Sequence, residues 1–268
     1  MKRTLLASAF LLGSAALTPV FAQEAAAAAE DNGPLAAKNF TSTVYLTTNY
    51  MFRGISNSDG PAVQGSVDYT WNGLFAGAWA SNTEFSDGNF EIDYYGGYRF
   101  SQYGLDFTLQ GIYYTYPGED EGASEGFDLG NGRDSDYGEL NIGVGKTFAA
   151  APLAPTIGLN YFYSPDTFGE DGDSHTYQGN VGITLPVGVG VYATLGYNET
   201  DGDKSTLGYT YLYFQTGANY TLHGFKLDVS YVGTDESDSL KRAYPDIAGD
   251  NPSKLIDGKF VFTVSRTF

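Results

Sequence analysis

The chain has 268 residues, with 14 Lys and Arg against 32 Asp and Glu, and it contains no cysteine. A net charge of −18 argues against nucleic acid and anionic lipid headgroups as partners, and favours cationic or neutral solutes. Without cysteine there is no disulfide framework, so stability must come from the hydrogen-bonded fold itself.

The N-terminus has the features of an export signal. Lys2 and Arg3 precede an apolar stretch from Leu5 to Leu17, and small-residue cleavage chemistry follows at Val20-Phe-Ala22. We therefore expect residues 1–22 to be removed, which changes the net charge from −18 to −20. The alternative, a membrane anchor, requires a longer uninterrupted apolar run. Residues 23–40 show no period of two, which predicts a flexible periplasmic tail before a domain at 41–268.

From Thr41 onward, apolar and polar residues alternate with the side-chain period of a β-strand. In 62–71, for example, Val63 and Val67 alternate with Gln64 and Asp68. The pattern predicts twelve strands, at 43–53, 62–71, 74–82, 90–100, 105–115, 137–148, 156–163, 177–185, 189–198, 209–220, 225–231 and 258–268.

The gaps between these strands alternate in length and charge. Short gaps are typical of tight turns, and Asn72-Gly73 is a strong hairpin signal. The other short gaps are 101–104, 149–155, 186–188 and 221–224. The longer gaps carry most of the acidic residues and lie at 54–61, 83–89, 117–136, 164–175, 199–208 and 232–257. Short turns at one rim, long loops at the other and an even number of strands are typical of outer-membrane barrels.

The last strand ends the chain with an apolar face formed by Phe260, Phe262, Val264 and Phe268. A closed barrel in lipid provides partners for both the backbone edge and the apolar face of this strand, because closure pairs the edge and the bilayer accepts the apolar side chains. The predicted fold is an all-β, antiparallel transmembrane β-barrel of about 12 strands, with short periplasmic turns and long acidic extracellular loops. A final phenylalanine resembles the closing strand of bacterial outer-membrane proteins. That resemblance implies that Phe268 is an assembly signal read by the barrel-assembly machinery.

Four segments in the first half resemble the TorF family of porin-like proteins. They are Thr48-Asn-Tyr-Met-Phe-Arg-Gly-Ile-Ser56, Pro61-Ala-Val-Gln-Gly-Ser-Val-Asp-Tyr69, Ala78-Trp-Ala-Ser-Asn82 and Glu91-Ile-Asp-Tyr-Tyr-Gly-Gly-Tyr98. The specific resemblance covers roughly residues 41–117. It implies a pore in the cell outer membrane, surrounded by outer-membrane lipids, and it names no transported solute.

With the apolar faces directed outward, ten charged side chains are expected to face the interior and line a pore. They are Arg53, Asp68, Glu91, Asp93, Arg99, Asp106, Glu139, Lys226, Asp228 and Lys259. Inward charges select ions in water-filled passages, but they also form salt-bridge networks that fill narrow barrels, for example by pairing Arg99 with Asp93 or Glu91. We expect a narrow channel for small solutes or cations. The alternative is a closed barrel that acts as a structural or surface-binding protein through its acidic loops.

The sequence does not favour an enzyme, a metal site or a cofactor. The two histidines, His175 and His223, fall in gaps at opposite rims, where they cannot share one catalytic site. Asp171-Gly-Asp173 and Asp201-Gly-Asp203 offer oxygen ligands to a hard cation such as calcium, but their spacing matches no helix-loop-helix site and favours solvated loop charge.

Overall fold

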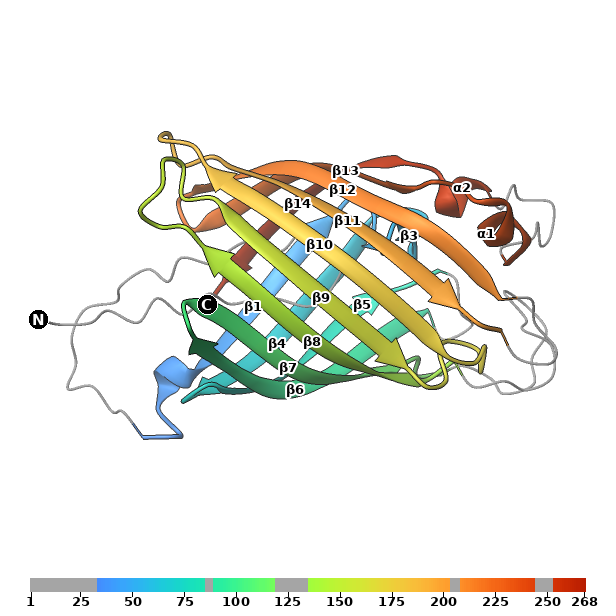
Figure 1. Ribbon diagram of the computed structural model, residues 1–268, viewed down its shortest axis with the longest axis horizontal. Helices are drawn as coiled ribbons and strands as arrows, with labels where there is room; N and C mark the ends of the chain where they lie inside the picture. Colours follow the sequence, from blue (N-terminus) through green and yellow to red (C-terminus); the bar gives the residue numbers. More distant parts are fainter. Residues whose placement is uncertain (1–32, 85–88, 119–134, 203–207, 244–252) are drawn as a thin grey trace, which may run out of the picture.

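The computed structural model describes residues 33–84, 89–118, 135–202, 208–243 and 253–268 (Figure 1). The expected signal segment 1–22, the first part of the expected tail and most of the loop 117–136 lie outside the described residues. Among the residues described, no helix has the length and apolar character needed to cross a membrane.

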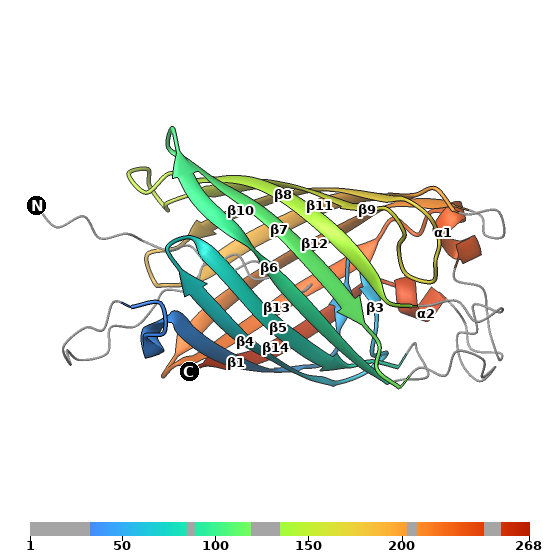
Figure 2. The ribbon, with the colours of Figure 1, turned by 90° about the horizontal axis from the view of Figure 1, so that it is seen from below.

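Twelve antiparallel strands form a closed barrel, which confirms the predicted fold (Figures 1 and 2). Going round the barrel the order is β1, β14, β13, β12, β11, β10, β9, β8, β7, β6, β5, β4, and β4 pairs with β1 again. The strands are β1 (Phe40–Thr47), β4 (Ala62–Trp71), β5 (Leu74–Asn82), β6 (Phe90–Gln102), β7 (Leu105–Thr115), β8 (Tyr137–Thr147), β9 (Thr156–Ser164), β10 (Ser174–Thr184), β11 (Gly190–Thr200), β12 (Tyr209–Leu222), β13 (Phe225–Thr234) and β14 (Lys259–Thr267). A short 3-10 turn, η1 (Ala37–Asn39), leads into β1.

The two-residue period of the sequence gives the barrel wall an apolar outer face and a polar inner face. Apolar side chains such as Val63, Val67 and Leu159 are exposed on the outside, while their polar neighbours Gln64 and Ser66 are buried inside. An outer apolar band on a closed antiparallel barrel is the arrangement that satisfies every backbone group of a strand that crosses a bilayer.

Three of the connections at one end are two-residue turns. Asn72 and Gly73 both have positive φ, 49° and 86°, as a type I′ hairpin requires. The same pair of positive φ values occurs at Tyr103-Gly104 and His223-Gly224. The chain's C-terminus lies at this short-turn end, on the left of Figure 1, and the longer connections lie at the opposite end.

The first long connection differs from the prediction. The strand expected at 43–53 ends at Thr47, and the gap expected at 54–61 is not an outer loop. Residues 48–61 instead turn into the barrel and form a two-stranded hairpin of their own, β2 (Met51–Phe52) and β3 (Ile55–Ser56), which we call the luminal hairpin (Figure 2). The apolar alternation of Val44 and Leu46 continues through Tyr50 and Phe52 because their side chains pack inside the barrel, on Trp79 and Tyr114, rather than on lipid.

Other boundaries shift by a few residues. β10 begins at Ser174, so His175 belongs to a strand and not to the expected loop 164–175. β13 extends to Thr234, and the segment expected as the loop 232–257 contains two short helices, α1 (Asp238–Ala243) and α2 (Ser253–Ile256), which lie at the long-loop end (Figure 1).

The C-terminal strand closes the barrel against the first strand. Val44 of β1 faces Arg266 of β14, and the backbone of Phe268 exchanges two hydrogen bonds with Ser42. The Phe268 side chain is exposed on the outside, where Arg266 lies over its ring. Its role as an assembly signal stays a prediction.

Candidate functional site

The barrel interior has two halves along its axis: the half at the long-loop end, which the luminal hairpin occupies, and the half nearer the short turns. Thr47 and Ala62, which flank the hairpin, lie opposite each other in the β1–β4 register. The fourteen residues between them are therefore not needed to connect the two strands and are available to fill the interior at the long-loop end.

One side of the hairpin packs on β5 and β6. The ring of Tyr50 lies 5.2 Å from that of Trp79, and the Tyr50 hydroxyl donates a hydrogen bond of 3.1 Å to Glu91 Oε1. Ser58 accepts a hydrogen bond from the Tyr50 backbone N–H, which fixes the hairpin's path before it enters the barrel.

The tip of the hairpin carries Arg53 across to β8. Arg53 has φ 46° and Gly54 has φ 85°, so the tip is a two-residue turn like those at the short-turn end. Both terminal nitrogens of Arg53 donate to the Glu139 carboxylate at 2.8 Å, and Tyr114 donates to the same group at 2.9 Å. The guanidinium also lies over the rings of Phe52 and Phe162. Burial lowers the pKa of Arg53, and Glu139 more than offsets it, so the pKa stands well above its usual value.

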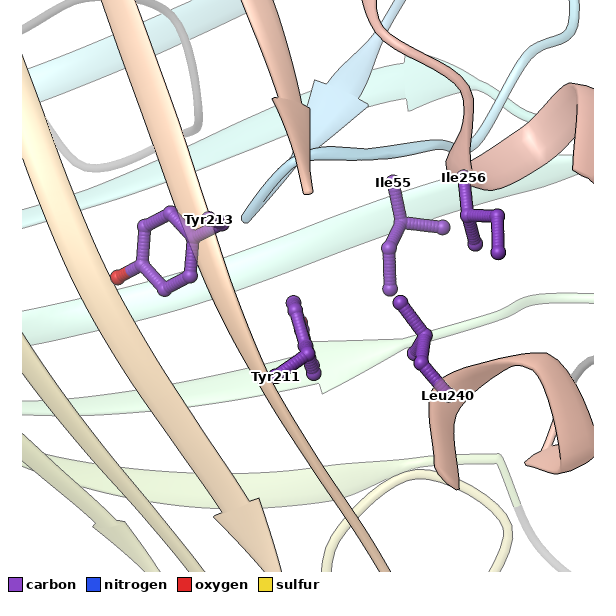
Figure 3. Close-up of a cluster of buried hydrophobic side chains, with 5 residues drawn as sticks. All are labelled: Ile55, Tyr211, Tyr213, Leu240 and Ile256. Carbon is purple, nitrogen blue, oxygen red and sulfur yellow. The ribbon is translucent and has the colours of Figure 1, made fainter. Parts of the chain in front are cut away.

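The other side of the hairpin reaches β12, β13 and β14. Met51 packs with Val232 and Val261. Ile55 forms a cluster with Tyr211 and Tyr213 of β12 and with residues of the two short helices, all labelled in Figure 3: Ile55, Tyr211, Tyr213, Leu240 and Ile256. A Cβ placed on Gly54 would lie 2.6 Å from the Gly233 carbonyl oxygen, so the tip closely approaches the wall. The hairpin therefore contacts opposite sides of the barrel.

The half nearer the short turns keeps a polar inner wall. Asp68 accepts hydrogen bonds from Ser66 and Tyr95, and Asp228 accepts one of 2.9 Å from Tyr192. Further polar groups on this wall belong to β9, β10 and β11, where Asn180 accepts hydrogen bonds from Gln178 and Thr194.

The structure separates the ten predicted side chains into two groups. Those around the luminal hairpin are Arg53, Glu91, Asp93, Glu139 and Lys259, and those on the inner wall of the other half are Asp68, Arg99, Asp106, Lys226 and Asp228. Lys259 forms an ion pair of 3.1 Å with Asp59, and Asp106 accepts a hydrogen bond from Ser101. The role of all ten side chains in lining a passage stays a prediction.

The suggested pairing of Arg99 with Asp93 or Glu91 is wrong. Six residues of strand separate Arg99 from Asp93, which is about 20 Å along β6. The guanidinium of Arg99 lies over the ring of Phe75 at 3.8 Å, and Asp68 is the carboxylate whose charge acts on it.

Sequence reasoning missed the aromatic lining under the hairpin. Tyr114 and Tyr137 stack at 4.4 Å, and Ile112, Tyr116 and Phe162 join them in one buried cluster. Strands 105–115 and 137–148 have large side chains on both faces at the long-loop end. An apolar inner face indicates that something packs inside the barrel at that level.

Two expectations from the sequence concern residues that the structure describes: that the chain has no metal site, and that its two histidines do not share one catalytic site. There, no group of three or more His, Cys, Asp or Glu side chains is arranged to hold a metal ion. His175 contacts Tyr161 and Tyr163, two residues that face outward from β9, while His223 lies in the turn between β12 and β13.

Comparison with known proteins supports the fold and leaves the activity open. One family, described as a bacterial protein of unknown function (Gcw_chp), matches residues 29–268. No curated protein matches the sequence. Among solved structures, the NanC porin is similar at 12% identity with a TM-score of 0.52, over 85% of this chain and 98% of that one. The KdgM porin is similar at 8% identity with a TM-score of 0.51, over the same shares of the two chains. These likenesses establish a shared barrel fold, and the TorF resemblance has no direct counterpart among them.

Proposed function

Because the chain belongs to the Gcw_chp family, whose description gives no function, we propose a function from the barrel itself: a porin-like outer-membrane channel for small solutes or ions. The observation that carries the proposal is the contrast between the two faces of the wall. The outer face is apolar, whereas the inner face near the short turns presents charged and hydrogen-bonding side chains. Such an inner face is typical of barrels that enclose water.

The luminal hairpin is the natural constriction of this channel. It contacts β5 and β6 on one side and β12 to β14 on the other, so a solute that enters from the long-loop end must pass beside it. A narrow passage suits small ions better than oligomers. The KdgM porin has been solved in complex with disordered oligogalacturonate, an acidic ligand that the charge of the present chain, −18, would repel.

The charges favour cations. The expected inner carboxylates outnumber the basic groups by six to four, and most of the 32 acidic residues lie in connections at the long-loop end. A low-dielectric wall focuses such a field and raises the cation concentration at the mouth.

Purified protein in planar bilayers tests the proposal. Stepwise conductance with a reversal potential that indicates cation preference is the expected result. Fractionation of cells should place the chain in the outer membrane, with the long connections outside.

A second candidate function has its own support. The hairpin's contacts on both sides of the interior also suit a closed barrel that works through its external loops. An outer-membrane protein that gives no conductance, but whose loops bind a surface ligand, would establish this second function instead.

A further inference from the structure

Two carboxyl groups are buried side by side where the luminal hairpin covers β5 and β6. Glu91 and Asp93 lie two residues apart on β6, so both side chains point inward from the same face of the strand. They are only 1% and 5% exposed. Ser81 and Trp79 lie opposite them in the β5–β6 register, and neither can carry a compensating charge. The two groups are therefore neighbours in a place that is sheltered from water.

A hydrogen bond joins the two carboxyl groups to each other. No N–H or hydroxyl group of the described residues donates to Glu91 Oε2 or to Asp93 Oδ1, although both atoms are buried. An ionised carboxylate only accepts hydrogen bonds, so a bond between two carboxyl groups exists only while one of them carries a proton. Two carboxylates at one site resist ionising together, because their like charges repel.

The titratable groups that face this pair in the described part of the chain are five tyrosines and one carboxylate. They are Tyr50 of the hairpin, Tyr95 of β6, Tyr114 and Tyr116 of β7, and Tyr137 and Glu139 of β8. The hairpin's guanidinium, Arg53, is bound through both terminal nitrogens to Glu139. Loss of the shared proton thus leaves two adjacent negative charges, with a third carboxylate acting on Asp93.

The luminal hairpin is what covers the pair. The Tyr50 hydroxyl donates to Glu91 Oε1, and the Asn57 side chain is also hydrogen-bonded to Glu91. The Tyr50 ring packs on Trp79 and is 2% exposed. β5 and β6 are joined to each other by a backbone ladder along the whole of β5, whereas side chains make most of the hairpin's contacts here. Water therefore reaches the pair more easily by displacing the hairpin than by opening the wall.

We propose that Glu91 and Asp93 form a proton-dependent latch on the luminal hairpin. While the two groups share a proton, the hairpin is closed onto β5 and β6. When the proton leaves to solvent, both groups are charged, and they recover their hydration only if Tyr50 and Asn57 move away. Low pH therefore favours closure and high pH favours release. The effect on conductance rests on the proposed function, whereas the movement of the hairpin does not.

Tryptophan accessibility tests the movement without reference to conductance. The chain has two tryptophans, and Trp71→Phe leaves Trp79 as the reporter beside Tyr50. In this parent, folded in uncharged detergent, acrylamide quenching should rise reversibly between about pH 5 and about pH 9, since buried carboxyl groups keep their protons as far as about pH 8–9. Adding Glu91→Gln with Asp93→Asn should abolish the rise, because amides hydrogen-bond to each other without a shared proton. Glu91→Gln alone removes the repulsion, should reduce the rise, and serves as the test if the double variant fails to fold.

Histidine provides the control, because it is the side chain that ordinarily titrates in this range. The chain has two histidines, His175 and His223, and changing both to glutamine in the same parent should leave the rise intact. Three results overturn the latch: no rise in the parent, a rise that persists in the double amide variant, or a rise that disappears in the histidine variant.

Conductance of the same variants in planar bilayers separates the latch from the proposed function. If both hold, conductance increases over the pH interval in which quenching rises, and it is constant in the double amide variant. A rise in quenching in a barrel that does not conduct supports the latch and rejects the channel. Quenching that is constant with pH in a conducting barrel rejects the latch and leaves the channel in place.

Discussion

At the scale of single residues, the Arg53–Glu139 pair is the strongest polar link between the luminal hairpin and the wall. Its side chains are 10% and 1% exposed. Removing one partner of a buried pair leaves an uncompensated charge and costs about 3–5 kcal/mol, whereas replacing both partners costs much less.

Arg53→Met should therefore loosen the hairpin and lower the free energy of unfolding, measured by urea titration in lipid vesicles. The double variant Arg53→Met with Glu139→Gln should recover most of the loss, because no buried charge remains. Equal stability of the single and double variants would show that the charge on Glu139 is solvated and that the pair is not a link of this strength.

Gly54 and Gly104 form a matched pair for a second residue-scale prediction. Both have positive φ, 85° and 73°, so an alanine at either site carries a similar backbone strain of roughly 1–2 kcal/mol. Only Gly54 is crowded: an added Cβ would meet the Gly233 carbonyl oxygen at 2.6 Å, while nothing lies within 4 Å of that position at Gly104.

Gly54→Ala should thus destabilise the protein more than Gly104→Ala in the same unfolding titration. The difference between the two variants measures how tightly the hairpin tip is held against β13. If the two variants lose the same free energy, the tip is free to move away from the wall.

At the scale of elements, the luminal hairpin can be removed without opening the barrel. Thr47 and Ala62 already face each other across β1 and β4, so an Asn-Gly turn in place of residues 48–61 should join them as Asn72-Gly73 joins β4 to β5. The shortened protein should show a larger stepwise conductance in planar bilayers, because the constriction is gone.

Heat-modifiable migration on gels provides the control that the shortened barrel has folded. A folded variant with the conductance of the wild type would mean that the hairpin is not the narrowest point of the path.

The elements also show what the sequence alone can and cannot predict. The strand from 62 to 71 was predicted to the residue, because Val63 and Val67 are exposed on the outside and Ala62, Gln64 and Ser66 between and beside them are buried inside. The strand from 43 to 53 was predicted too long, since Tyr50 and Phe52 extend the alternation of Val44 and Leu46 while packing inside the barrel on Trp79 and Tyr114. The two-residue period shows that one face of a segment is apolar, but it does not show whether lipid or protein covers that face.

The candidate site was predictable in part for a related reason. The inward direction of Asp68, Glu91 and Asp93 followed from alternation. The partnership of Arg53 with Glu139 did not, because it joins residues 86 positions apart through a hairpin that leaves the wall. Contacts of that kind depend on how a segment folds back, which no local pattern records.

At the scale of the whole molecule, charge is distributed unevenly along the barrel axis. Among the described residues, acidic side chains such as Glu84, Glu170 and Asp201 are exposed to solvent in connections at the long-loop end. Asp68, Asp106 and Asp228 instead lie on the inner wall near the short turns, each holding a hydrogen bond from a neighbouring hydroxyl. The two groups should respond differently to salt, because charges at an exposed mouth are screened more than charges on an enclosed wall.

This difference allows ion preference to be assigned to its source. The wild type should prefer cations, and the preference should weaken from low to high salt, since the screening length falls from about 30 Å at 0.01 M to about 3 Å at 1 M. Replacing Asp68, Asp106 and Asp228 by asparagine keeps hydrogen-bond acceptors in place and removes only the charge. In reversal-potential measurements, that variant should lose the preference that remains at high salt, whereas Glu170→Gln with Asp201→Asn, which removes two exposed charges from long connections, should reduce the preference at low salt only. A wild type that prefers anions would refute the electrostatic argument.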